Sequence, residues 1–157
     1  MNLNIPYLET DNKLLNDAYR IAAGDIVGNI VYYQNGLLTE EKPCMIAGLD
    51  YNTPWTRDTA INIWNALSIL SPEVSKNTLL AVLEEEEGSI YIGGQYWDSI
   101  IWMIGAREYC RFHKDDNFYR LAFEAGRNSV HRLEEDEFDE EDGLFRGPAV
   151  YGDGIAA

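Results

Sequence analysis

Apolar positions recur at helical spacing along most of the chain and predict five helices. In the first of them, Leu14, Ala18, Ile21 and Ile26 fall on one stripe with polar residues between them. A serine–proline pair at positions 71–72 ends the second helix and opens the third. The predicted helices cover about residues 11–30, 54–70, 72–85, 97–113 and 115–133, with short strands allowed around 30–33, 44–47 and 90–92.

The predicted helices are of two kinds. Those at 54–70 and 97–113 are apolar almost all round, whereas the other three each carry a polar face. A helix that is apolar on every side must be buried on every side. The alternation therefore predicts an outer and an inner layer of helices. The fold class we expect is all-α, an (α/α) toroid.

The connections between the predicted helices alternate in the same way. Short turns follow the second and fourth helices. Long segments rich in Gly, Tyr, Trp and Asp occupy residues 47–53, 92–98 and 143–154. In such a toroid the long segments gather at one end, around the starts of the inner helices. Long ordered loops on a rigid scaffold are where binding usually occurs.

The composition is that of a strongly acidic chain of one ordinary domain. With 157 residues and a formal net charge of −15, it lacks the clustered basic residues that nucleic acid requires, and it suits a neutral or cationic ligand. No apolar run approaches the roughly 20 residues of a membrane span, so we expect no membrane partner. The first residues do not resemble a signal peptide, which favours a cytoplasmic location or leaves the compartment unknown. Cys44 and Cys110 show no metal spacing and favour two unpaired thiols over one disulfide.

The segment 53–60, Thr-Pro-Trp-Thr-Arg-Asp-Thr-Ala, combines a helix start with side chains suited to a sugar. Thr53 is the expected N-cap, and the proline after it suits the first helical position. Trp55 offers a flat apolar face, Arg57 a rigid fork of donors and Asp58 a strong acceptor. These match the C–H faces and hydroxyl rim of a sugar ring. A capped helix whose Arg and Asp pair with neighbours is the alternative.

At these residues the chain resembles the six-hairpin (α/α) glycoside hydrolases, the superfamily of glucoamylase, trehalase and processing α-glucosidase. The segment Trp55-Thr56-Arg57-Asp58 is similar to the glucoamylase element in which Arg and Asp hydrogen-bond the hydroxyls of the bound sugar. Residues 94–98, Gly-Gln-Tyr-Trp-Asp, resemble the second aromatic loop of such barrels. Residues 143–145 and 151–154 resemble the loop after the fifth helix, which in several of these families carries the general acid.

The chain departs from this family in its length. A complete toroid needs roughly twelve helices, and only five or six are predicted here, about half. The partner carboxylate of these enzymes lies far towards the C-terminus, outside this chain. We therefore interpret residues 1–157 as the N-terminal part of an (α/α) toroid catalytic domain, and the isolated chain as lacking the partner carboxylate that activity requires. The open seam predicts association with the missing C-terminal half or a homodimer.

Glycosidic hydrolysis needs one carboxylic acid to protonate the leaving oxygen and one carboxylate to activate water, about 6.5–9.5 Å apart in an inverting enzyme. Asp153, between two glycines, is the candidate acid, with an ordinary turn aspartate as the alternative. Asp98 either caps its helix or binds a sugar hydroxyl, and we favour binding. Gln95 and Arg146 can also hold hydroxyls, or Arg146 can pair with an acidic neighbour at 140–142. The aromatic residues that either stack on a sugar or pack in the core are Trp55, Tyr96, Trp97 and Tyr151.

Two acidic runs and two histidines are assigned no catalytic role. Residues 84–87 are expected to fray into solvent at the end of the third helix, where negative charge opposes the helix dipole. The run at 134–142 does not match EF-hand spacing, so no metal is expected there, and no cofactor is implied. His113 and His131 stand alone and are interpreted as structural.

The sequence therefore predicts a glycoside hydrolase with an inverting acid/base mechanism, acting on a neutral, α-linked carbohydrate substrate. Arg57 and Asp58 would grip the terminal ring, and Asp153 would donate the proton. A sugar epimerase or polysaccharide lyase on the same toroid is one alternative, which the scarcity of His and the net charge oppose. A non-catalytic carbohydrate-binding or scaffold domain is the other.

Overall fold

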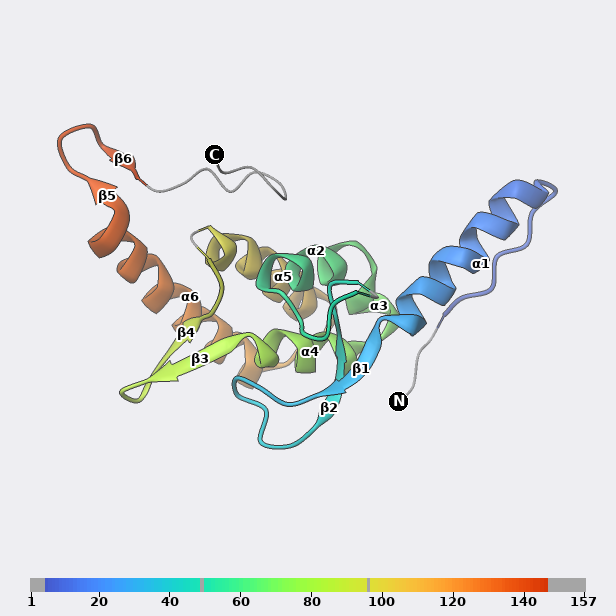
Figure 1. Ribbon diagram of the computed structural model, residues 1–157, viewed down its shortest axis with the longest axis horizontal. Coiled ribbons are helices and arrows are strands. Elements are labelled where there is room, and N and C mark those ends of the chain that lie inside the picture. The colour runs from blue at the N-terminus through green and yellow to red at the C-terminus, as the bar shows by residue number, and fades with distance from the viewer. Residues whose placement is uncertain (1–4, 49, 96, 147–157) are drawn as a thin grey trace.

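The computed structural model describes residues 5–48, 50–95 and 97–146 of the chain. Helices α2, α4, α5 and α6 gather in the centre, while α1 extends away on one side and small hairpins lie at the periphery (Figure 1). The elements are α1 (Lys13–Gly28), β1 (Ile30–Tyr33), β2 (Lys42–Met45), α2 (Thr56–Asn62), the π-helix η1 (Ile63–Leu67), α3 (Ser68–Leu70), α4 (Pro72–Ala81), β3 (Leu83–Glu86), β4 (Ser89–Ile92), α5 (Asp98–Phe112), α6 (Asp116–Glu137), β5 (Phe138–Asp139) and β6 (Leu144–Phe145).

The expected all-α class is wrong, because three two-stranded antiparallel sheets accompany the helices: β1 with β2, β3 with β4, and β5 with β6. The predicted helix 72–85 ends at Ala81, and the acidic residues after it form β3. Glu87 and Gly88 have φ angles of 52° and 80°, as a tight two-residue hairpin turn requires. This turn pairs β3 with β4 and keeps the acidic run from fraying.

The predicted helix over 54–70 is present as α2, η1 and α3, but it begins at Thr56. Trp55 is extended, with φ −109° and ψ 140°, and it precedes the first helical turn. Thr53, the expected N-cap, instead lies 2.8 Å from the hydroxyl of Tyr33. Ser71 caps α4, as predicted, by accepting from the Val74 amide at 3.4 Å.

Helices α2 and α5 pack directly against each other. A β-carbon on Gly105 would lie 2.7 Å from the Cα of Ala60, so the backbones meet closely at this point. Burial on every side, which the sequence predicted for both helices, is wrong for the described chain, since one face of each is open. The exposed apolar side chains are Ile61, Trp64, Ile69, Ile100 and Ile104.

Helix α1 stands apart from the central helices (Figure 1). None of its residues is buried, and Leu14 and Ile21 from its apolar stripe are among the exposed large apolar side chains. The side chain of Asn12 caps it by accepting from the amides of Leu14 and Leu15. None of the helices in the described residues is long and apolar enough to cross a membrane.

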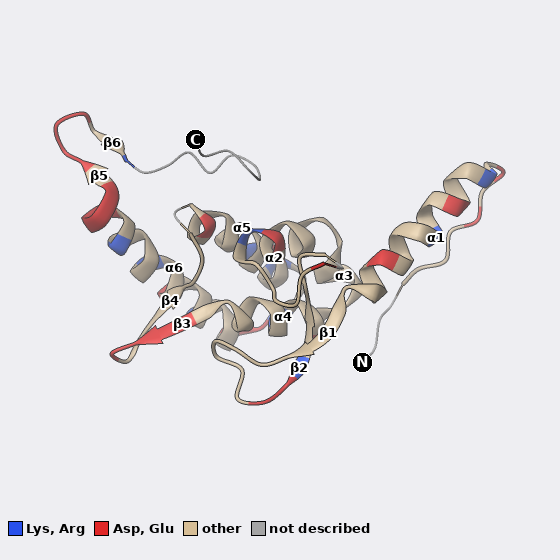
Figure 2. Ribbon diagram, in the orientation of Figure 1, with Lys and Arg blue, Asp and Glu red and all other residues tan. Residues whose placement is uncertain are grey.

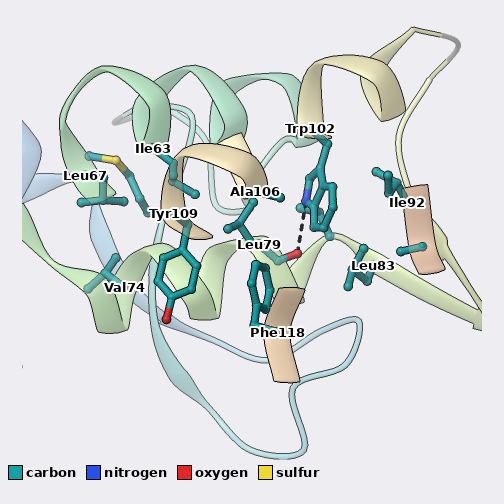
Figure 3. Close-up of a cluster of buried hydrophobic side chains, with 13 residues drawn as sticks. Ile63, Leu67, Val74, Leu79, Leu83, Ile92, Trp102, Ala106, Tyr109 and Phe118 are labelled. Carbon is teal, nitrogen blue, oxygen red and sulfur yellow. Dashed lines mark hydrogen bonds between the residues drawn. The ribbon is translucent and has the colours of Figure 1, made fainter. Parts of the chain in front are cut away.

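The core lies between α4, α5 and α6 and is built around aromatic rings (Figure 3). Trp102 is fully buried, and its ring lies 6.5 Å from that of Phe118, which in turn meets Tyr109 edge-on at 5.0 Å. Cys44 is buried and Cys110 is half-buried, and both are free thiols, as predicted.

The C-terminal end of α4 organises the segments around it. An α-helix leaves its last carbonyl groups without partners inside the helix. Here the carbonyls of residues 79–82 accept, in chain order, from Trp102 Nε1 at 3.3 Å, Leu37 N at 3.1 Å, Asn35 Nδ2 at 3.2 Å and Gly93 N at 2.8 Å. These bonds attach α5, the β1–β2 loop and the segment after β4 to one helix end.

The start of α6 is tied to α4 through Asp115. Its carboxylate accepts from the Phe118 amide at 3.0 Å and pairs with the Lys76 ammonium at 2.6 Å. The hydrogen bond from Lys76, followed by that from the Phe118 amide, holds the pKa of Asp115 below its usual value. The cap and the ion pair together fix where α6 begins.

Replacing Trp102 by alanine is expected to lower the free energy of unfolding by about 3–5 kcal/mol, because it leaves a cavity in the core. It also removes the donor to Leu79. Urea unfolding followed by circular dichroism measures the change. Trp64→Ala is the control, since Trp64 is 50% exposed, and it should change stability by less than about 1 kcal/mol. Equal losses in the two variants would contradict the core described here.

Candidate functional site

A pocket of about 270 Å³ lies where the segments before α2 and before α5 meet, and we call it the Trp55 pocket. Residues 53–56 form one wall, and residues 93–95 with Asp98 form another. Asn35 from the β1–β2 loop and Glu84 from β3 complete the polar lining. Three residues that the sequence predicted to contact a sugar, Trp55, Gln95 and Asp98, are thus brought together.

Gly93 joins the two walls of the Trp55 pocket. Its amide donates to Val82 at the end of α4, and its carbonyl accepts from the Thr56 hydroxyl at 2.7 Å. Both Thr56 and Gly93 are buried. The first turn of α2 is therefore held against the loop before α5 by a bond that water does not reach.

Asp98 lies at the start of α5 and turns its carboxylate back over the loop. Its Oδ2 accepts from the Gln95 amide at 3.0 Å, before the helix, and Asp98 lines the pocket, while its binding of a sugar hydroxyl stays a prediction. Gly94 has a φ of 116°, and a β-carbon there would lie 2.8 Å from Thr56 Oγ1 and 3.0 Å from Asp98 Oδ2. Only glycine lets the carboxylate approach the backbone in this way.

Trp55 presents an aromatic surface at the rim of the pocket. It is 43% exposed and contacts Tyr51 edge-on, with ring centroids 5.7 Å apart. The backbone at Trp55 is extended, and the helix begins at the next residue. The exposed ring area is available to a ligand.

Arg57 and Asp58 belong to α2 but not to the described lining of the Trp55 pocket. Successive residues of a helix point in directions about 100° apart, so Thr56 faces the pocket while Arg57 and Asp58 face elsewhere. Both side chains are half-buried and engaged by other residues. Their predicted role in gripping a sugar stays a prediction.

Arg146 takes its alternative role as a partner of an acidic neighbour, whereas Trp97 is half-buried and packs against the β5–β6 hairpin, outside the described core. The Trp97 ring packs edge-on against Phe145 of β6, with centroids 5.7 Å apart. Arg146 pairs with Asp139, Nη2 to Oδ2 at 2.7 Å, and with Asp142, inside the β5–β6 hairpin. The hydrogen bond from Arg146 holds the pKa of Asp139 below its usual value. Neither residue belongs to the described lining of the Trp55 pocket.

Three predicted site residues, Tyr96, Tyr151 and Asp153, lie outside the described residues. The role of Asp153 as proton donor therefore stays a prediction. Of the three aromatic loops expected to converge, those before α2 and α5 do meet at the Trp55 pocket. In the third aromatic segment, which begins at residue 143, Phe145 contacts Trp97 from the segment before α5.

Glu84 is the pocket residue that sequence reasoning missed. It is exposed on β3 opposite Tyr91, and a β-carbon on Gly93 would lie 2.5 Å from its Oε1. The carboxylate therefore lies against the wall that residues 93–95 form. The signal that could have found it is Gly88 followed by the strand-like segment 89–92, Ser-Ile-Tyr-Ile, which marks a hairpin.

The described lining of the Trp55 pocket contains no histidine and no group of metal ligands. Across the part of the chain that the structure describes, no three His, Cys, Asp or Glu side chains come together as metal ligands. His113 lies 2.6 Å through Nε2 from the Ser68 carbonyl, and His131 pairs with Glu134 at 3.3 Å. Both histidines thus have structural neighbours away from the Trp55 pocket.

Comparison with known proteins gives no matching family model, no matching curated protein and no matching solved structure. The resemblance to six-hairpin glycoside hydrolases therefore rests on the residues quoted for it. Any assignment of function has to come from the pocket itself.

Thr56→Val should lower the free energy of unfolding by about 1–3 kcal/mol, because it keeps the side-chain shape but leaves the buried Gly93 carbonyl without its donor. Thr59→Val is the matched control. Thr59 is also buried on α2, and its hydroxyl has no partner among the described residues, so this change should be neutral or stabilising. Urea midpoints measure both effects. Identical midpoints for wild type and Thr56→Val would show that this bond does not hold the walls together.

Proposed function

We propose that the Trp55 pocket binds one ring of a neutral, α-linked sugar and that the chain serves a glycoside hydrolase. The observation that carries this proposal is that Trp55, Gln95 and Asp98, which come from two separate loops, line one pocket. Ligand pockets combine apolar surface with a few placed polar groups. An exposed indole beside an amide and a carboxylate is such a combination for a sugar.

The size and polarity of the Trp55 pocket support a single ring. Its volume of about 270 Å³ lies near the lower end of the range for ligand sites, roughly 300–1,000 Å³. Asn35 and Gln95 supply amide donors and acceptors, while Glu84 and Asp98 supply carboxylate acceptors. With no basic side chain in the described lining, a ring with many hydroxyls fits better than a uronate or a phosphate.

The carboxylates support the hydrolytic part of the proposal. Glu84 and Asp98 lie against the consecutive glycines Gly93 and Gly94, whose Cα atoms are separated by about 3.8 Å. Both carboxylates therefore lie against one short loop in the lining of the Trp55 pocket. Asp98 is engaged by the Gln95 amide and is assigned to a sugar hydroxyl. Glu84 is assigned the activation of water, in place of the carboxylate that the resemblance put outside this chain, and Asp153 stays the predicted proton donor.

Replacing Trp55 by alanine should weaken the binding of an α-linked glucose disaccharide, maltose, about three- to tenfold, because the stacking surface is lost. Isothermal titration calorimetry of the whole chain measures the affinity. Trp64→Ala is the control, since Trp64 is an equally exposed tryptophan on η1 that does not line this pocket. Absence of maltose binding, or equal weakening by both variants, would overturn the proposed site.

Hydrolysis is tested separately from binding by release of nitrophenol from aryl α-glycosides. We expect turnover that Glu84→Gln and Asp153→Asn each abolish. Binding without turnover in the wild-type chain would instead support a non-catalytic carbohydrate-binding domain. Turnover that survives both substitutions would remove these carboxylates from the mechanism.

A further inference from the structure

We propose that a second pocket, adjoining the Trp55 pocket, binds the neighbouring ring of an oligosaccharide and selects a ring that carries a protonated amine. The inference rests on the function proposed above, because it extends the same site by one ring. This second pocket, which we call the acidic pocket, has a volume of about 450 Å³. Strand β4, the first turn of α5 and helix α6 enclose it.

The two pockets share a boundary. Glu84 and residues 93–95 belong to the lining of both pockets. The loop after β4 therefore lies between the two pockets as a single layer of chain. A ligand ring in the Trp55 pocket therefore has its attached ring beside the acidic pocket. Oligosaccharides bind in this way, one ring to each adjoining compartment of a cleft.

The acidic pocket carries carboxylates on both sides. Glu84 projects from β3, and Asp136 and Glu137 come from the last turns of α6. Figure 2 shows the acidic residues concentrated at β3 and at the C-terminal end of α6, the two elements that supply these carboxylates. A protonated amine forms short, charge-assisted hydrogen bonds with carboxylates.

The basic side chain in the described lining, Arg132, does not neutralise these groups, because its charge is already engaged. Its guanidinium donates to both carboxylate oxygens of Glu86, at 2.7 Å and 3.3 Å, and lies 3.5 Å over the ring of Tyr91. The hydrogen bond from Arg132 holds the pKa of Glu86 below its usual value. The remaining charge of the lining is negative and favours a cation.

A buried hydroxyl without a partner points to a ligand independently of the charge. Ser99 lines the acidic pocket, is 6% exposed, and its Oγ has no hydrogen-bond partner among the described residues. By contrast, the Ser129 hydroxyl in the same pocket accepts from the Ile92 amide at 2.8 Å. Buried polar groups normally find partners, and a sugar hydroxyl supplies the one that Ser99 lacks.

The arrangement of the carboxylates in the acidic pocket favours an organic cation over a metal ion. They do not form a group of three or more metal ligands in the described part of the chain, so a metal ion has no cage here. A ring with one amine and several hydroxyls can reach a carboxylate and the Ser99 hydroxyl at the same time. The acidic pocket therefore fits an amino sugar.

The test compares three disaccharides of one linkage on the whole chain by calorimetry: maltose, α-1,4-linked glucosyl-glucosamine and the N-acetylated form of the latter. The amine should bind about five- to twentyfold more tightly than the N-acetylated form at low salt, and high salt should reduce the difference. The double variant Asp136→Asn, Glu137→Gln should bring these two affinities within about twofold of each other. Glu135→Gln, on the same helix and outside the described lining of the acidic pocket, is the control.

The outcomes separate this inference from the proposed function. Maltose binding with no preference for the amine would overturn the inference and leave the Trp55 pocket standing. An amine preference that the double variant does not alter would overturn the location. An amine preference lost in the double variant, in a chain that does not bind maltose and is insensitive to Trp55→Ala, would support the acidic pocket and overturn the proposed function.

A further variant tests the buried hydroxyl. Ser99→Ala should weaken binding of the amine disaccharide about two- to fivefold without lowering the urea midpoint, because no hydrogen bond within the protein is lost. A lower midpoint with unchanged affinity would show that Ser99 stabilises the fold and does not contact the ligand.

Discussion

The carbonyl groups at the C-terminal end of α4 are the constraint on which the rest of the structure depends. A helix end that is buried must find donors for its last carbonyls, since an unpaired buried polar group is strongly unfavourable. Residues 79–82 find these donors in α5, in the β1–β2 loop and in the segment after β4. Elements far apart in the sequence are thereby attached to one point. The aromatic core around Trp102 lies on one side of that point, and the Trp55 pocket lies on the other.

The candidate site inherits its geometry from that attachment. Gly93 donates to the end of α4 and accepts from Thr56, so the loop before α5 and the start of α2 are positioned together. Glu84 then lies against Gly93, and Asp98 against Gly94, in this loop. The end of α4 thus positions Gly93, and Gly93 positions the loop that the two pockets share. The carboxylates and the exposed indole of these pockets define the chemistry of the ligand.

Hydrophobic periodicity predicted where the helices lie, because a stripe at 3.6-residue spacing survives in any sequence that packs one helix face. It failed at β3, where three glutamates in a row resemble a helix end and the cross-strand bonds that make them a strand are not visible in composition. Hydrophobic periodicity also failed to predict burial. Helix α1 and the open faces of α2 and α5 carry apolar residues, but no other described element covers them. For the site, local chemistry identified Trp55, Gln95 and Asp98. Glu84 was missed because its place depends on a hairpin register.

The central claim is that the loop joined to α4 and α2 through Gly93 forms the floor of a sugar site. The most direct measurement is the change in backbone amide and indole NMR signals of the whole chain as maltose is added. The account predicts that the largest shifts fall on the amides of Gly93, Gly94 and Gln95 and on the Trp55 indole, with the Trp64 indole unmoved. Saturable shifts that leave these signals in place and move others would contradict it.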